Sequence, residues 1–366
     1  MVANDGKNTA IPVGVPQYVI DHAPLLHLST KDPYKPSSYA NTLRNTRPQI
    51  HFRDLPSPSP LTLSHLDQLN NASGGDVYLT STVDITTNPE WLKGIRPDAN
   101  GSTGEEKTSV VIVVEKGGGV TDVFYVYFWA FNWGGVVLGE QLGDHVGDWE
   151  HNMIRFQNGI PKAVWYSQHA NGEAFTFSAL KKDKTGKRPL AFAANGSHAL
   201  YPTPGTHDHT IPNLTLPVPV LLVDETDPGP IYDPLLSSYY YSYTASTKTL
   251  TPYTSPSASE VPVGFLYFKG RWGDEQYPDT DQRQKQLVGN RKYVGGPTGP
   301  LDKQVDRKEV WPQNAWSKGQ RVRGWVGLWV YGPGRDFVSK VVGWVGSCGG
   351  RKKKGKRVLV SGEGVR

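Results

Sequence analysis

His145, Asp148 and Glu150 are the side chains of this sequence best suited to chemistry, because they follow closely on a strongly apolar stretch. A carboxylate buried alone costs free energy, so buried carboxylates are paired, hydrogen-bonded or bound to a metal ion. Side chains of an extended segment alternate between two faces, which places Asp148 and Glu150 on one face and His151 on the other. Gly147 allows a turn, so that His145 can fold back toward the two carboxylates.

One imidazole and two carboxylates on one face suit a hard or borderline divalent cation, with Mg²⁺, Mn²⁺ or Ca²⁺ as the candidates. The same residues also suit a hydrogen-bonded histidine–aspartate pair that orders a loop without any metal. The sequence therefore predicts either a cation site made by His145, Asp148 and Glu150 or a polar loop anchor.

The elements that position these residues are expected to be strands. The chain holds 18 Tyr, 11 Trp, 40 Gly and 29 Pro, a composition typical of a β-rich fold, either all-β or α+β. The clearest element is a hairpin of residues 153–156 and 163–166 around Asn158 and Gly159. Residues 110–114, 123–133 and 265–268 are also predicted to be strands. No internal repeat or linker is evident before residue 311, which predicts a single domain over residues 1–310.

The single cysteine, Cys348, excludes an intrachain disulfide and favours a reducing compartment. The N-terminal residues lack a basic-then-apolar signal pattern, and no stretch reaches 18 uninterrupted apolar residues. We therefore expect a soluble, cytoplasmic protein.

Residues 311–366 differ sharply in composition from the rest. They contain 12 Lys/Arg and 2 Asp/Glu, a net charge of +10. Residues 1–310 contain 27 Lys/Arg and 32 Asp/Glu, a net charge of −5. The acidic body argues against nucleic-acid binding. The tail has three readings: a disordered basic segment that contacts anionic lipid at a membrane surface, a localisation signal, or an artefact of the gene model. The abrupt change in composition favours the artefact.

Seven segments, in order from residue 22 to residue 300, resemble the Vps62 family of vacuolar protein sorting-associated proteins. This resemblance implies a role in vacuolar protein targeting and a location in the cytoplasm or at the vacuole periphery, without a biochemical mechanism. The resemblance to the family stops near residue 311. The segments are HAPLLHLSTKDPYKPSS (22–38), GGDVYLTSTVDITTNPEWLKG (74–94), HVGDWEHNMIRFQNG (145–159), SQHANGEAFTFSAL (167–180), GKRPLAFAANGSHALYPTPGTHDHTIP (186–212), GRWGDEQYPDTDQRQ (270–284) and KYVGGPTGP (292–300).

A shorter stretch resembles the G-H-R-H-D-W-E signature of necrosis-inducing NPP1-like proteins. His145, Asp148 and Glu150 match its first His, its Asp and its Glu, whereas Gly147 replaces its second His. The segment with His169 also resembles a His-Gly segment of that family. The resemblance implies a divalent cation in an acidic cavity on a central β-sandwich with peripheral short helices and long loops. The secreted, disulfide-bearing character of those toxins is missing here, which argues against cytolysis.

Three functions follow as hypotheses. The first is a binder of a small polar molecule or lipid head group through the cation site, with Arg271 or residues 187–188 neutralising an anionic ligand. The second is a metal-dependent hydrolase, isomerase or cyclase in which His151 or His198 is the general acid/base. The third is a non-catalytic trafficking adaptor. The residues expected to bind the ligand are His169, His207, His209, Arg271 and Asp274.

Overall fold

Strands form most of the regular structure in the computed structural model, which describes residues 11–57, 60–137, 139–208, 223–254, 260–287, 289–313 and 321–325. The helices within the described residues are short, and the longest of these, α2, has six residues. These features confirm the prediction of a β-rich fold. No helix among the described residues is long and apolar enough to cross a bilayer.

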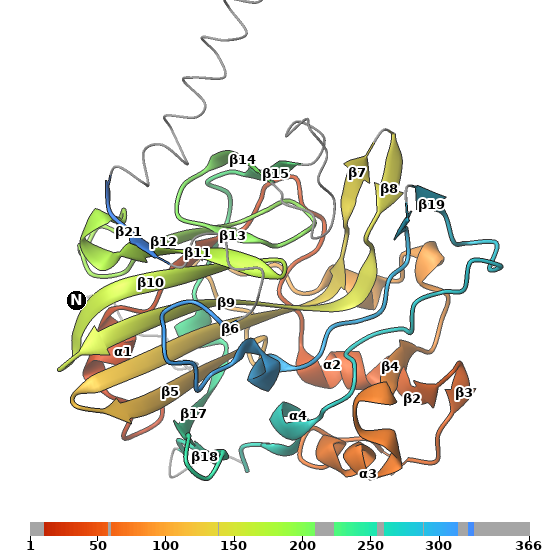
Figure 1. The fold of residues 1–366 in the computed structure, drawn as a ribbon, viewed down its shortest axis with the longest axis horizontal. Coiled ribbons are helices and arrows are strands. Elements are labelled where there is room, and N and C mark those ends of the chain that lie inside the picture. The colour runs from red at the N-terminus through yellow and green to blue at the C-terminus, as the bar shows by residue number, and fades with distance from the viewer. Residues whose placement is uncertain are drawn as a thin grey trace, which may run out of the picture.

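An eight-stranded sheet forms the centre of the molecule (Figure 1). Its strand β6 (Val120–Asn132) is buried from Thr121 onward because both faces of the sheet are covered. The predicted hairpin is confirmed: Asn158 and Gly159 both have positive φ, as a tight turn between antiparallel strands requires. The sheet order is β18 (Thr249–Pro252), β17 (Ser238–Thr244), β5 (Ser109–Gly117), β6, β9 (His145–Gln157), β10 (Ile160–Gln168), β11 (Asn171–Thr176) and β21 (Val322–Arg323).

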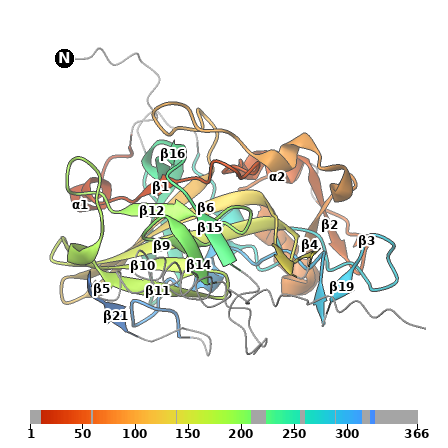
Figure 2. The same ribbon diagram turned by 90° about the horizontal axis from the view of Figure 1, so that it is seen from above.

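A second, four-stranded sheet covers one face of the large sheet. In Figure 2 its strands β1 and β12 lie over β9 and β10. Leu26 and Ala191 of the small sheet share a hydrophobic core with Val111 and Tyr125 of the large sheet. The two packed sheets confirm the central β-sandwich. The order of the small sheet is β13 (Leu200–Tyr201), β12 (Leu190–Ala193), β1 (Leu25–His27) and β16 (Ile231–Tyr232).

Short helices and a three-stranded sheet cover the opposite face, at the lower right of Figure 1. A second core there joins Phe124 and Trp149 to Tyr39 of α2 and Phe265 of α4. The prediction of a strand at 265–268 is wrong, because these apolar residues form α4, whose buried turn packs on Leu63 through a main-chain hydrogen bond of 2.7 Å. The helices are α1 (Gln17–Asp21), α2 (Tyr39–Arg44), α3 (Asn70–Ser73) and α4 (Gly264–Tyr267), with 3₁₀ turns η1 (Leu66–Leu69), η2 (Gly74–Asp76), η3 (Ile85–Thr87), η4 (Glu90–Lys93), η5 (Phe177–Ala179), η6 (Pro234–Leu236) and η7 (Pro300–Lys303).

The remaining strands form small sheets at the periphery. Within the predicted tail, residues 311–313 and 321–325 are described, and Val322 and Arg323 extend the large sheet by pairing with β11. The domain boundary at 310 stays a prediction. The peripheral strands are β2 (Thr46–Ile50), β3 (Arg53–Asp54), β4 (Tyr78–Ser81), β7 (Gly135–Val137), β8 (Glu140–Leu142), β14 (Gly205–Asp208), β15 (Val223–Thr226), β19 (Gln286–Leu287) and β20 (Asn290–Arg291).

Candidate functional site

The predicted alternation along β9 is confirmed. Asn152 accepts a hydrogen bond from the hydroxyl of Tyr127 (3.0 Å) in the core under the small sheet, and Asp148 lies on that side too, bonded to His198 (2.8 Å). Trp149 points into the opposite core. The side chains of Asp148 and Asn152 therefore project between the two sheets of the sandwich.

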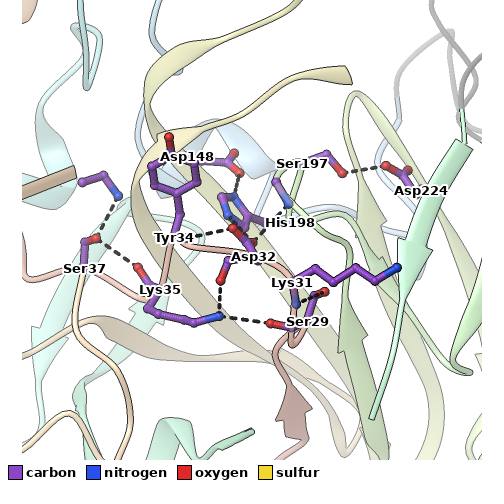
Figure 3. A network of polar contacts seen from close by, with 12 residues as sticks. Ser29, Lys31, Asp32, Tyr34, Lys35, Ser37, Asp148, Ser197, His198 and Asp224 are labelled. Carbon is purple, nitrogen blue, oxygen red and sulfur yellow. Dashed lines mark hydrogen bonds and ion pairs between the residues drawn. The ribbon is translucent and has the colours of Figure 1, made fainter. Parts of the chain in front are cut away.

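His198 is the centre of this polar region (Figure 3). Its ring is fully buried and stacks on the indole of Trp129, with centroids 4.4 Å apart and planes 8° apart. Nδ1 lies 2.8 Å from Oδ2 of Asp148, and Nε2 lies 3.2 Å from Oδ2 of Asp32. The imidazole is thus enclosed by an aromatic face and two carboxylates.

These two carboxylates determine the charge of His198. Burial alone would lower the pKa of His198, but the hydrogen bonds and charges of Asp148 and Asp32 raise it to about 9. Burial alone would raise the pKa of Asp148, but the bond and charge of His198 lower it. At neutral pH the group is therefore a buried imidazolium between two carboxylates.

Asp32 also fixes the backbone around His198. Its Oδ1 accepts from the main-chain N–H of Tyr34 (2.9 Å), and its Oδ2 accepts from that of Gly196 (3.1 Å). His198 has a left-handed backbone with φ of 56°, a conformation that costs free energy for a non-glycine residue. Asp32 therefore holds the 196–198 turn in place, a role that the sequence did not predict.

Glu150 lies on the same face as Asp148 and has a different environment. Burial and the neighbouring Asp148 charge raise the pKa of Glu150 to about 7. Its Oε2 accepts a hydrogen bond from the hydroxyl of Ser167, which itself accepts from the main-chain N–H of His151 (2.7 Å). Two buried carboxylates therefore stand side by side with opposite pKa shifts.

A second histidine–aspartate unit adjoins the first through the neighbouring residue Ser197. The Ser197 hydroxyl donates to Oδ1 of Asp224 (2.6 Å), and the Tyr201 hydroxyl donates to Oδ2 (2.6 Å). His169 Nε2 lies 2.9 Å from Asp224 Oδ2. Burial opposes the charge on His169, but the Asp224 carboxylate outweighs it and raises the pKa of His169. We call Asp32, Asp148, His169, Ser197, His198 and Asp224 the His–Asp network.

His145 is close to the network, but its side chain is hydrogen-bonded to the backbone of Gly147. Its Nδ1 lies 2.6 Å from the carbonyl oxygen of Gly147, so this nitrogen carries the donated proton. Burial lowers the pKa of His145, although the Asp148 charge opposes this shift. The neutral ring then presents an unprotonated Nε2, the arrangement that metal-binding histidines usually have.

The predicted acid/base candidate His151 lies on the other face of β9, away from Asp148 and Glu150. Neither ring nitrogen has a hydrogen-bond partner among the described residues, and the ring centroid lies 5.7 Å from that of Phe124. Burial, with the charges of Arg307 and Lys303, lowers the pKa of His151 far below its usual value. His151 and His198 are therefore separated by the sheet.

The other predicted ligand residues are dispersed. His207 stacks on Tyr201 with ring centroids 3.8 Å apart, which connects it to the network through the Tyr201 hydroxyl. Asp274 accepts from the Ser81 N–H (2.7 Å) and from a tyrosine hydroxyl. Arg271 forms main-chain bridges outside the network. Arg188 forms a bidentate ion pair with Asp233. His209 lies outside the described residues.

The residues of the predicted cation site retain unused ligand atoms. Among the described residues, no hydrogen bond reaches Oδ1 of Asp148, Oε1 of Glu150 or Nε2 of His145. Across those same parts of the chain, no three His, Cys, Asp or Glu side chains stand in the geometry of a metal site. The cation site at His145, Asp148 and Glu150 therefore stays a prediction.

Comparison with known proteins identifies the family. Residues 19–213 match the family model described as Vps62, vacuolar protein sorting-associated protein 62. The chain is 36% identical over 368 residues to Vacuolar protein sorting-associated protein 62 of Saccharomyces cerevisiae (strain ATCC 204508 / S288c), covering 93% of this chain and 74% of that protein. The chain belongs to the Vps62 family. Membership supports a role related to vacuolar protein sorting, and such a role fits an intracellular location.

A second relative from the same yeast bears the name "Putative vacuolar protein sorting-associated protein TDA6". This Vps62-family chain is 37% identical to it over 335 residues, which cover 84% of the chain and 70% of that protein.

Solved structures are also similar, at a low level. Necrosis and Ethylene inducing Protein 2 from the causal agent of cocoa's Witches Broom disease is 14% identical, with a TM-score of 0.26, covering 56% of this chain and 75% of that one. NLPPya in complex with mannosamine is 11% identical, with a TM-score of 0.26. The match covers 65% of this chain and 81% of that one. A TM-score of 0.26 is too low to carry a ligand or an activity across.

Proposed function

We propose that this Vps62-family protein binds a hydrated divalent cation at Asp148 and Glu150 and uses it to bind a small polar ligand or lipid head group. The observation that carries the proposal is the pair of buried carboxylates on one face of β9, each with one oxygen that accepts no hydrogen bond from the described residues. Because a second buried negative charge is costly beside the first, a cation would stabilise the ionised form of both.

His145 supports the same site from the N-terminal end of β9. Its Nδ1 donates to the Gly147 carbonyl, which leaves Nε2 as the nitrogen able to bind a metal ion. A cation held by His145, Asp148 and Glu150 would supply a positive charge that recognises oxygen atoms of a ligand.

His169 supports an approach for the ligand. Its side chain is 22% exposed, whereas that of His198 is completely buried. The charge of Glu150 contributes to the raised pKa of His169, so the two side chains are neighbours. The ligand would therefore approach past His169 and would not contact His198.

The test begins with elemental analysis of the purified chain and calorimetric titration with Mn²⁺, Mg²⁺ and Ca²⁺. Glu150→Gln is the preferred variant, because Gln can still accept from Ser167 and resembles the protonated side chain. We expect about tenfold or greater loss of cation affinity in Glu150→Gln, since one charged ligand is removed. Glu115→Gln, which neutralises an exposed carboxylate on β5, is the matched control and should bind as the wild type does.

The ligand is then sought with thermal shift assays against polar metabolites and lipid head groups, with and without the bound cation. A ligand supports the proposal if it raises the melting temperature only in the presence of the cation and does not raise it in Glu150→Gln. Equal metal content in wild type, Glu150→Gln and Asp148→Asn would refute the site.

The opposite pKa shifts of Asp148 and Glu150 favour one second candidate, a metal-dependent hydrolase, isomerase or cyclase. Carboxylates whose pKa values are pushed apart are a frequent acid/base arrangement, and Glu150 with a pKa of about 7 could exchange protons at neutral pH. In that case Glu150→Gln would abolish turnover of a bound compound while the compound still binds. A binder would show loss of binding with no product in either protein.

A further inference from the structure

We propose that a second site, separate from the carboxylates of β9, binds the phosphate group of a phosphomonoester or of inorganic phosphate. The site is a cavity of about 350 Å³ whose lining includes three basic side chains, Lys35, Lys93 and Arg96. Asp32 is the acidic residue of this lining, and its carboxylate is already used by His198 and two main-chain N–H groups.

The backbone holds the basic side chains around the cavity. Lys35 N–H donates to the Lys93 carbonyl (2.8 Å), and Ile95 N–H donates to the Pro36 carbonyl (2.9 Å). Gly94 permits this close approach: its φ is +70°, and a Cβ there would lie 2.0 Å from the Lys35 carbonyl oxygen. The segments around residues 35 and 94 are therefore locked together, which preorganises the charges that they carry.

Lys35 is positioned further by its own ammonium group, as Figure 3 shows. Nζ donates to the carbonyl oxygens of Ser29 (3.0 Å) and Asp32 (2.5 Å). An ammonium has three N–H groups, so one remains for a ligand. Burial lowers the pKa of Lys35, the Asp32 charge opposes this, and the nearby Arg96 charge lowers it again. An anion between Lys35 and Arg96 would relieve that repulsion.

Arg96 is the residue with the most donors to offer. It is exposed, and none of its nitrogens makes a hydrogen bond or ion pair within the described residues. Lys93 is paired with Glu90 at the rim, so its contribution to an anion is smaller. A guanidinium and an ammonium converging on one cavity are the groups that bind phosphate oxygens, the first by two parallel N–H donors and the second as a point charge.

The cavity is connected to the His–Asp network through Asp32. The main-chain oxygen of Asp32 accepts from Lys35, while its carboxylate binds His198. The inference does not rest on the proposed cation, because neither Lys35 nor Arg96 contacts Asp148 or Glu150 in the described structure. Glu150→Gln should therefore leave phosphate binding intact, and this separates a failure of one proposal from a failure of the other.

The experiment is a titration of the full chain with inorganic phosphate at low ionic strength, followed by calorimetry. We expect saturable binding that weakens about tenfold or more in Arg96→Gln and in Lys35→Met. Arg53→Gln removes an exposed arginine on β3 and should match the wild type. Absence of saturable binding, or an equal loss in Arg53→Gln, would overturn the proposal.

A second arm separates the two sources of a phosphate group. Phosphatidylcholine vesicles with and without a phosphoinositide monophosphate are compared with soluble inositol phosphate. Tighter binding to the phosphoinositide vesicles, lost in Arg96→Gln, assigns the site to a lipid head group. If the chain binds soluble inositol phosphate as tightly as the phosphoinositide vesicles, the site is assigned to a free phosphomonoester. Binding to both vesicle types that persists in Arg96→Gln contradicts the site.

Discussion

The imidazole of His198 lies parallel to the indole of Trp129, 4.4 Å away between centroids and tilted by only 8°. Both side chains are completely buried. An aromatic face attracts a cation, so the stacking stabilises the charged form of the histidine that Asp148 and Asp32 also favour. The centre of the sandwich is thus organised around an ion pair network and not around aliphatic side chains alone.

The charge on His198 should make stability depend on pH. The pKa is about 9 in the folded chain and about 6.5 in an unfolded one, so the stabilisation is complete below pH 6.5 and is lost as pH rises through 9. The expected loss is on the order of 3 kcal/mol. Urea unfolding between pH 7 and pH 9.5 measures it. In His198→Gln the decline should be absent, whereas the exposed His65→Gln should retain it; an unchanged slope in His198→Gln would contradict this account.

Glu150→Gln should stabilise the metal-free protein at high pH. Because burial and Asp148 raise the pKa of Glu150 from 4.5 to about 7, its ionisation penalises folding as pH rises through 7. We expect a gain of about 3 kcal/mol at pH 8 and almost none at pH 4, measured by urea unfolding in the presence of a chelator. Glu115→Gln should leave the free energy of unfolding unchanged at both pH values. A loss of stability at pH 8 would show that the carboxylate has a cationic partner even without metal.

Arg307→Met should be neutral or stabilising. The Arg307 guanidinium is buried, none of its nitrogens has a hydrogen-bond partner in the parts of the chain that the structure describes, and burial lowers its pKa to about 9. Its contacts are with the rings of Phe124 (5.0 Å) and Trp165 (5.3 Å), and methionine can replace such packing. We expect a change between zero and a gain of about 2 kcal/mol in the free energy of unfolding. A clear loss of stability would indicate an anionic partner for Arg307 in solution.

Gly147→Ala should be severely destabilising. Gly147 has a φ of +73°, and an added Cβ would lie 1.7 Å from the carbonyl oxygen of Trp272. We expect a loss of about 3 kcal/mol or more, with displacement of Asp148. Gly118→Ala is the matched control, because Gly118 also has positive φ but has no atom within 4 Å of the new Cβ. It should cost about 1 kcal/mol. Similar melting temperatures for the two variants would refute the steric explanation.

The local features of the fold could be predicted from sequence because they depend on neighbouring residues. The alternation of β9 follows from the period of an extended chain, and the β9–β10 turn follows from the tolerance of Asn158 and Gly159 for positive φ. The residues at 265–268 were misjudged, since a four-residue apolar run is compatible with a buried helical turn as well as a strand.

The candidate site was less predictable because its partners are distant in sequence. Asp148 and Glu150 were identified from their spacing on one strand. Asp32 was missed, because it reaches the turn at Gly196 across 164 residues and nothing local indicates this approach. Asp224 was not identified either; it is buried and accepts hydrogen bonds from Ser197 and Tyr201, which precede it by 27 and 23 residues.

The pairing of β21 with β11 has a consequence for how the chain behaves when shortened. Val322 and Arg323 cover part of the outer edge of β11, and Arg323 forms an ion pair with Glu173 on that strand. Cutting the chain at residue 310, where composition changes, would uncover main-chain groups at Ala174 and Phe175. Such an edge is a template for strands of other molecules, so the shortened chain would self-associate where the longer one is protected.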